Sequence, residues 1–280
     1  MLVLTCSSKL AALRCLLTHS FPESLKACGA LHHVINGNPF KLEVLVDRWP
    51  EFSTVMCRPS LEDMKDPSDH YTNTYFLFSR DPQNLRQILE DPKAVNWNQD
   101  LQIQGCQPAL GGVLQEVSSK HGKQMQTTSN FLYMKDRIAE EELEKINNIR
   151  DLQFSVLMPD EAHLVNAVWG FGGNERSELY VRRCIQNFPT VCMRRGGVGE
   201  PLAWVMSEHS AEMRMGYTDK LYRGLGVFRS MILKLTKKMA TIGTPLYCHV
   251  APNNMSSQAA TLAAGFPLAG RWQQWNFQPL

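Results

Sequence analysis

The chain has 280 residues, of which 44% are hydrophobic and 20% are charged, and its formal net charge at pH 7 is +2. This is the composition of a folded globular protein with room for two medium-sized domains, which excludes disordered and fibrous chains. The nearly balanced charge argues against a nucleic-acid binder, and the apolar runs are shorter than the roughly 18 residues needed to span a membrane. The sequence leaves the oligomeric state open.

The start of the chain is basic and poor in acid. It contains Lys9 and Arg14, and the first acidic residue is Glu23. A basic, acid-poor and amphipathic start is typical of a mitochondrial targeting segment. The alternative is an ordinary first helix that begins near Ser7 and ends before Pro22. The residues alone leave both interpretations open.

The N-terminal half mixes strand and helix patterns. In chain order we expect strands near Ala30–Ile35, Glu43–Asp47, Ser53–Cys57 and Thr72–Phe78, helices near Pro82–Glu90 and Leu101–Ser118, and a strand near Ser129–Met134. The stretch Lys135–Arg150 is dense in charge and low in large apolar residues, so it predicts a connector. We expect it to divide the chain into two domains, 1–150 and 151–280.

The second half has a clearer alternation of elements, with Asp160 and Asn174 as expected helix N-caps. In chain order we expect a strand at Leu152–Leu157, helices at Asp160–Trp169 and Glu175–Phe188, strands at Thr190–Arg195, Pro201–Ser207 and Ala211–Thr218, a helix at Val227–Thr241, a strand at Pro245–Val250, a helix at Asn254–Ala264 and a strand near Arg271–Phe277. The whole pattern predicts an α/β (α+β) fold in which helices flank a mixed central sheet.

The cysteines and histidines give no metal-binding pattern. The eight cysteines include no CxxC pair and no Cys/His cluster at zinc spacing, so we expect reduced thiols. His32 and His33 are expected in a strand, where adjacent side chains point to opposite faces. The sequence therefore predicts no metal site.

A basic, glycine-containing turn separates a strand from a helix in the second half. It reads Arg223-Gly224-Leu225-Gly226, and the helix opens at Val227. Two glycines allow a tight turn that exposes backbone N–H groups, and the N-terminus of the following helix favours a phosphate. The alternative is a plain turn with a solvated arginine. The turn lacks the endings of a P-loop and of a dinucleotide fingerprint.

The order of elements around this turn resembles the acetyltransferase-like (GNAT) superfamily, which uses acyl-coenzyme A. The superfamily's turn has the form R-x-x-G-x-G/A, and residues 223–227 match it, whereas Phe228 stands where Gly or Ala is usual. The resemblance implies that residues 223–227 hold the pyrophosphate of coenzyme A. It also implies that Asn254 and Gly265-Phe266 flank the pantetheine arm.

A closer resemblance covers nearly the whole chain. The sequence is similar to the glycine N-acyltransferase family, and leans toward its "glycine N-acyltransferase-like" branch, most sharply in the strings GGNERS at 172–177, EMRMGYT at 212–218 and WQQWN at 272–276. The resemblance implies transfer of an acyl group from the co-substrate acyl-coenzyme A to glycine or a similar amino acid, with no tightly bound cofactor. It also implies a role in conjugating and detoxifying acids. The expected location is mitochondrial, with the endoplasmic reticulum or cytoplasm as alternatives, and the N-terminal domain is expected to be a degenerate copy of the same fold.

The same resemblance gives roles to residues of the strand before the turn. Glu212 matches the family's catalytic glutamate and is expected to be the general base, and His249 is the alternative base. Backbone N–H groups near Met215 or Gly216 are expected to bind the thioester oxygen. Gly216 is also expected to mark a bulge that splays this strand from Pro245–Val250. The residues alone favour a different interpretation, in which Glu212 is a carboxylate paired with an arginine and His249 is a packed core histidine.

Two other functions remain open at this point. One is a non-catalytic acyl-coenzyme A-binding or regulatory protein of the same fold, which the unusual Phe228 favours. The other is a domain that uses the glycine turn for a nucleotide phosphate. Titration with acyl-coenzyme A, free coenzyme A and ATP separates these functions.

Overall fold

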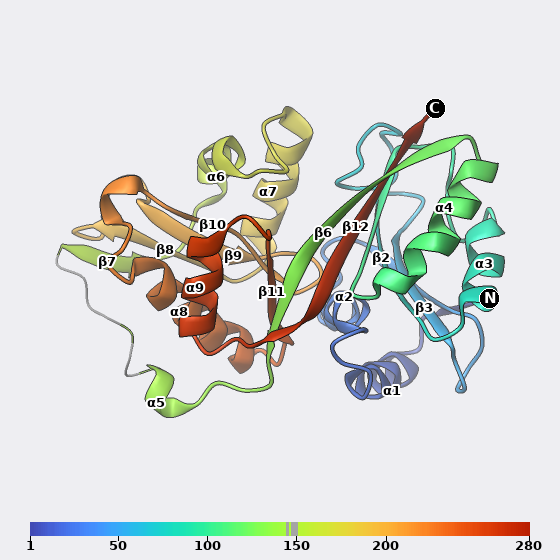
Figure 1. Cartoon of the computed structure of the whole chain (residues 1–280), viewed down its shortest axis with the longest axis horizontal. Coiled ribbons are helices and arrows are strands. Elements are labelled where there is room, and N and C mark those ends of the chain that lie inside the picture. The colour runs from blue at the N-terminus through green and yellow to red at the C-terminus, as the bar shows by residue number, and fades with distance from the viewer. Residues whose placement is uncertain (144–145, 147–150) are drawn as a thin grey trace. The chain divides into compact units, whose positions relative to one another are not determined.

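The computed structural model describes residues 1–143, 146 and 151–280, and these form two compact units. The first unit combines Met1–Asn130 with the C-terminal Gly270–Leu280, and the second comprises Phe131–Ala269 (Figure 1). Both units pack helices on a sheet, so the expected α/β (α+β) class is confirmed. No helix within the described residues has the length and apolar character needed to cross a membrane.

These units differ from the division expected at residue 150. The expected division assigned 131–150 to the first domain and 270–280 to the second. In the structure, 131–150 falls in the range of the second compact unit and 270–280 belongs to the first. The C-terminal strand belongs to the first unit because it pairs along its length with a strand of that unit, Gln273 opposite Gly105 and Phe277 opposite Leu101. Of the expected connector 135–150, residues 144–145 and 147–150 lie outside the described residues.

The first unit is built on a sheet with the strand order β1-β2-β3-β4-β5-β12. Neighbouring strands are antiparallel except β4 and β5, which are parallel. Its strands are β1 (Leu2–Leu4), β2 (Leu42–Val46), β3 (Thr54–Pro59), β4 (Thr74–Ser79), β5 (Leu101–Gly105), most of β12 (Leu268–Pro279) and the first part of β6 (Lys123–Lys135). Its helices are α1 (Ser7–Thr18), α2 (Leu25–Ile35), α3 (Pro82–Glu90), the short η1 (Pro108–Leu110) and α4 (Gly111–Lys120).

Two expected elements of this unit are wrong. Ala30–Ile35 was expected as a strand but lies in helix α2, whose residues 25–33 are all buried. A short apolar segment that is buried on every side has no period that separates helix from strand. Leu101–Ser118 was expected as one helix but contains β5 and α4. The alternating leucine, glutamine and isoleucine residues favour a strand, and Pro108 prevents one continuous helix because it has no backbone N–H.

The second unit has the strand order β6-β11-β10-β9-β8-β7. Its strands are the end of β6, β7 (Leu152–Ser155), β8 (Thr190–Arg195), β9 (Ala203–Ser207), β10 (Met213–Thr218) and β11 (Leu246–Val250). Its helices are α5 (Glu140–Leu143), η2 (Pro159–Glu161), α6 (Ala162–Val168), α7 (Glu175–Asn187), η3 (Lys220–Tyr222), α8 (Val227–Thr241) and α9 (Met255–Ala263). The expected cap Asp160 is wrong: α6 begins after Glu161, because the preceding residues form the separate turn η2.

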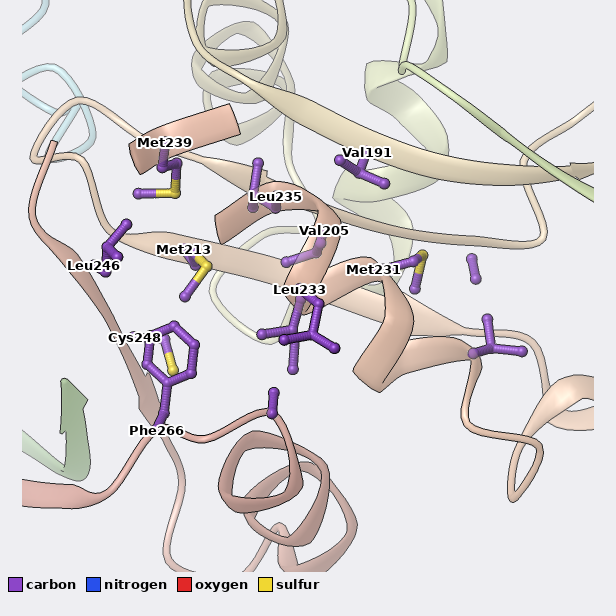
Figure 2. Packing of buried hydrophobic residues seen from close by; sticks show 14 of the residues in the cluster. Val191, Val205, Met213, Met231, Leu233, Leu235, Met239, Leu246, Cys248 and Phe266 are labelled. Carbon is purple, nitrogen blue, oxygen red and sulfur yellow. The ribbon is translucent and has the colours of Figure 1, made fainter. Parts of the chain in front are cut away.

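Helix α8 provides one wall of the core of this unit. Its side chains Met231, Leu235 and Met239 gather against Val205 of β9 and Met213 of β10 (Figure 2). Because strand side chains alternate between faces, the residues on either side of Met213 point to the opposite face of the sheet. That opposite face carries the candidate site.

Candidate active site

Strand β10 loses its regular pairing halfway along. It pairs with β11 in parallel at Met213 and Cys248, and its antiparallel register with β9 shifts between Arg214 and Tyr217. Within that shift, Met215 adopts a left-handed backbone with φ of 55°. The expected bulge in this strand is therefore confirmed, and its strained residue is Met215 rather than the neighbouring glycine.

The bulge changes which residues share a face. Strict alternation would put Gly216 on the face of Glu212 and Arg214, but the extra residue reverses the order. A Cβ atom built on Gly216 would lie 2.5 Å from Cε2 and 2.6 Å from Cζ of Phe228, the second residue of α8. Gly216 thus faces α8, and the Phe228 ring packs directly on its backbone.

Glu212 and His249 contact each other across the two parallel strands. Glu212 immediately precedes β10, and His249 lies on β11 one residue after Cys248. Oε1 of Glu212 forms a short hydrogen bond with Nδ1 of His249. The carboxylate side chain is fully buried, and the imidazole retains 9% exposure. The structure brings together the two residues that the sequence offered as alternative bases.

One aromatic ring from the segment between α6 and α7 lies against His249 of this pair, and a second lies near the neighbouring Arg214. The Phe171 ring lies edge-on to His249 with centroids 6.5 Å apart. The guanidinium of Arg214 lies 5.4 Å from the Phe171 ring and 5.6 Å from the Trp169 ring. Trp169 in turn stacks on Tyr180 at 5.8 Å. Sequence reasoning missed both rings, because a short loop gives no signal of what it covers.

A polar frame fixes the segment that carries these rings. The side chain of Asn166 donates to the carbonyl of Asn174 at 3.0 Å and accepts from the N–H of Gly173 at 3.0 Å. A Cβ on Gly172 would lie 2.7 Å from Oδ1 of Asn166, so only glycine fits there. The side chain of Asn174 accepts from the N–H of Ser177, which confirms the expected N-cap of α7. The string at 172–177 therefore builds the loop.

A second, deeper acid–histidine pair lies in the turn between β9 and β10. Nδ1 of His209 is 2.8 Å from Oε2 of Glu208, and both side chains are almost fully buried. The Tyr180 hydroxyl donates to the same Glu208 oxygen at 3.0 Å, and the Tyr247 hydroxyl donates to the carbonyl of Ser210 at 2.7 Å. Sequence reasoning missed this cluster, because the three consecutive polar residues at 208–210, between two strands, are typical of a solvent-exposed turn.

The pKa values of two side chains in this region are raised mainly by burial. Burial raises the pKa of the Tyr180 hydroxyl well above its ordinary value, and the nearby Cys184 and Glu208 add to the shift. Burial also raises the pKa of the Cys248 thiol, and the negative charge of Glu212 raises it further. Both groups are therefore neutral at physiological pH, and the ionisable pairs beside them are screened little by water.

The glycine turn opens helix α8 as expected, but the short helix η3, which the sequence did not predict, separates it from strand β10. Gly224 and Gly226 have φ of 77° and 76°, a left-handed conformation that favours glycine. Gly226 is the N-cap of α8 and offers no side chain to its first N–H groups. Arg223 donates from Nε to the carbonyl of Thr218 at 3.0 Å, which ties the turn to the end of β10. Leu225 is exposed at the tip of the turn.

Asn254, expected to flank the pantetheine arm, and the adjacent histidines His32 and His33 have partners within the fold. The side-chain oxygen of Asn254 accepts from the N–H of Ser257 and caps α9. His32 and His33 were expected in a strand but lie in helix α2, with their rings edge to face at 5.3 Å. Among the residues that the structure describes, no group of three or more His, Cys, Asp and Glu side chains could hold a metal ion.

Comparisons with known proteins agree across the chain. A family model described as aralkyl acyl-CoA:amino acid N-acyltransferase matches residues 1–189, and the model of its C-terminal region matches residues 191–279. The chain is 39% identical to glycine N-acyltransferase of Homo sapiens, over 94% of both chains. It is 36% identical to glycine N-phenylacetyltransferase of Bos taurus, over 94% of this chain and 95% of that one.

Solved structures with low sequence identity share the fold. An X-ray structure of a Drosophila protein superposes with a TM-score of 0.78 at 15% identity, over 99% of this chain and 98% of the other. A GCN5-related N-acetyltransferase-like protein from Streptococcus suis gives a TM-score of 0.53 at 14% identity, over 98% of this chain and all of the other. At these identities the likeness shows the fold alone.

Proposed function

We propose, because this chain belongs to the aralkyl acyl-CoA:amino acid N-acyltransferase family, that glycine is its acceptor and that proton removal depends on Glu212. The protein is an acyltransferase that moves an acyl group from acyl-coenzyme A to the amino group of an amino acid. Glycine is supported as the acceptor by the names of relatives that are 36–39% identical. The acyl group is expected to be arylalkyl, as the family's description says.

The observation that carries the proposal is the buried contact between Glu212 and His249. An amino acid reaches the site mainly as an ammonium ion, which has no lone pair with which to attack. A base must therefore take a proton as the nitrogen approaches the thioester carbon. A buried carboxylate and an imidazole held in contact form a pair that can accept that proton. This arrangement supports an active enzyme over a non-catalytic acyl-coenzyme A-binding protein.

We place coenzyme A along the second half of β10 and the turn that follows. The backbone N–H groups of Gly224–Val227 and the positive charge of Arg223 are proposed to hold the pyrophosphate at the start of α8. The N–H groups at Met215 and Gly216 are proposed to stabilise the negative charge on the thioester oxygen. The pairing of β10 with β11 at Met213 and the register shift beyond it support this placement, because diverging strands leave backbone groups for a ligand. The capped start of α9 at Asn254 is proposed to border the pantetheine arm.

A mitochondrial location and a role in conjugating and detoxifying acids complete the proposal. They are supported by the family resemblance alone, because the basic, acid-poor start of the chain folds as helix α1 with Leu10, Leu13 and Leu17 buried. Imaging of the tagged full-length chain beside a mitochondrial marker tests the location. Signal in the endoplasmic reticulum or the cytosol would contradict it.

The function is tested by following thiol release. Benzoyl-, phenylacetyl- and acetyl-coenzyme A are each combined with glycine, glutamine or no acceptor. We expect release with an aralkyl donor and glycine. Binding of acyl-coenzyme A without any release would instead identify a non-catalytic binding protein. Replacing Glu212 with Gln should lower the rate at neutral pH by roughly 10²–10⁴-fold without changing acyl-coenzyme A affinity.

A further inference from the structure

We infer that the imidazole of His249 takes the proton from the acceptor amine and that Glu212 is a positioning residue behind it. The inference rests on the proposed function and assigns the parts of its proton-accepting pair. A base must lie within hydrogen-bond reach of the proton that it removes. The Glu212 side chain has no exposed surface, whereas the imidazole keeps 9%. Of the two groups in contact, the imidazole is the one a substrate can reach.

The direction of the contact fixes the tautomer of His249. Glu212 approaches Nδ1, and a carboxylate can only accept a hydrogen bond. Nδ1 therefore carries the hydrogen in the neutral ring, and Nε2, on the other side of the ring, carries the lone pair. When Nε2 gains a proton, the imidazolium lies directly against a buried negative charge. Glu212 thus both orients the base and stabilises its protonated form.

The charged groups around the imidazole support this division. Glu212 is the group in contact, and Arg214 lies on the same face of β10, with its guanidinium 5.4 Å from the Phe171 ring that is itself edge-on to His249. On the neighbouring strand positions, Cys248 and Tyr133 pair across β11 and β6 and point to the other face. The pKa values of both are raised by burial first, so they are neutral at physiological pH. The negative charge of Glu212, in contact with the ring, therefore favours protonation of His249, and the positive charge of Arg214 opposes it.

The resulting step balances in atoms and electrons. Nε2 of His249 takes one proton from the ammonium ion, and the freed nitrogen lone pair forms a bond to the thioester carbon. The tetrahedral intermediate collapses as the carbon–sulfur bond breaks and its electron pair stays on sulfur. Of the three protons on the ammonium nitrogen, one remains in the amide, one ends on the coenzyme A thiol, and one leaves His249 for water.

The chain contains a matched control for this experiment. His209 also contacts a glutamate through Nδ1, at 2.8 Å from Glu208. Its side chain is only 2% exposed, and it belongs to the turn that supports β10 rather than to the reacting pair. Replacing His209 removes a buried acid–histidine contact without removing the proposed base. It reports what the loss of such a contact does to folding alone.

The test is the pH profile of kcat/KM for thiol release by the wild type, His249→Gln, Glu212→Gln and His209→Gln. In the wild type, kcat/KM should fall at low pH as the base becomes protonated, and this fall is the acid limb of the profile. We expect His249→Gln to lower kcat by roughly 10²–10⁴-fold and to abolish the acid limb. Glu212→Gln should keep that limb but move it down by roughly one to three pH units, because an imidazolium without its negative neighbour loses its proton more readily. His209→Gln should keep the limb in place, whatever its effect on thermal stability.

Added imidazole and a measurement on the unaltered protein complete the test. Imidazole should restore part of the rate of His249→Ala and none of that of Glu212→Ala, because it replaces only the proton acceptor. In the wild type, diethyl pyrocarbonate should acylate His249, with loss of activity in proportion, and bound acyl-coenzyme A with glycine should protect it. His209 should stay unmodified. This measurement applies even if the variants do not fold.

The outcomes separate the inference from the function on which it rests. A wild type that releases no thiol with any amino acid would refute both. An active wild type whose acid limb survives in His249→Gln and disappears in Glu212→Gln would make Glu212 the direct base and overturn the inference alone. Loss of activity without modification of His249 would also overturn it.

Discussion

Replacing Gly216 with alanine is expected to displace Phe228 from its place against β10. The new Cβ would lie 2.5 Å from one ring carbon and 2.6 Å from the next. Carbon atoms pack at roughly 3.5–4.0 Å, so the ring or the strand must move by about 1 Å. Gly216 is not among the residues with positive φ, so alanine adds no backbone strain. The cost of this substitution is therefore steric.

The size of the effect follows from the surroundings of the ring. Overfilling a packed site costs about 1–3 kcal/mol, and a half-buried ring such as Phe228 can relieve part of the clash by turning outward. We expect Gly216→Ala to lower the free energy of unfolding in urea by about 1 kcal/mol. Acyl-coenzyme A affinity should fall as well, because the displaced ring enters the region proposed for the pantetheine arm.

A double variant separates this steric effect from any other. Phe228→Ala in the Gly216→Ala background should recover most of the loss, which gives a coupling of roughly 0.5–3 kcal/mol. Gly112→Ala is the matched control, since its new Cβ would meet no atom within 4 Å and its φ is not positive. Additive effects of the two changes at Gly216 and Phe228, or equal costs at Gly216 and Gly112, would refute the packing described here.

Three further predictions concern other parts of the second unit. Gly226→Asp should weaken coenzyme A binding by tenfold or more at low salt in calorimetric titrations, since it places a carboxylate beside the proposed phosphates; unchanged affinity would remove the turn from the site. Tyr180→Phe should lower stability in urea by about 1–3 kcal/mol, because buried Glu208 loses a donor; a neutral effect would contradict that contact. Burial alone raises the pKa of Glu161, but hydrogen bonds, chiefly from Arg194, hold it below its ordinary value of 4.5. Its contribution is present above that pH and lost as pH falls through the lowered value, so Glu161→Gln should flatten the acid limb of the stability curve; an unchanged limb would contradict the assignment.

The sequence predicted those parts of the site that depend on local geometry. Gly224 and Gly226 both occupy left-handed positions, and a strand–turn–helix reading places them without knowledge of the rest of the chain. The bulge near Gly216 was also predicted, because glycine inside a strand marks such irregularities. The family resemblance singled out Glu212.

Long-range contacts were beyond prediction. Glu212 and His249 are 37 positions apart, and their contact depends on the pairing of Met213 with Cys248. The polar turn at 207–210 is buried because Tyr180 and Tyr247 reach it from distant elements. Local composition predicts that such a turn is exposed to solvent, but contacts from elements distant in the sequence bury it.

The proposed chemistry needs a proton-accepting pair and a binding site for the thioester, and strand β10 contributes to both. The bulge divides the strand between these two roles. The proton-accepting pair must be held rigidly, and Glu212 adjoins Met213, where β10 has a strand partner on both sides. A ligand needs backbone groups that the sheet does not use, and these follow after the register shift at Met215. A left-handed non-glycine residue costs of order 1–3 kcal/mol, and it persists only where its surroundings hold it. Without the bulge, the regular hydrogen bonding between β10 and β9 would continue and Gly216 would no longer face Phe228. The backbone N–H groups proposed to bind the thioester oxygen would then be used by the sheet.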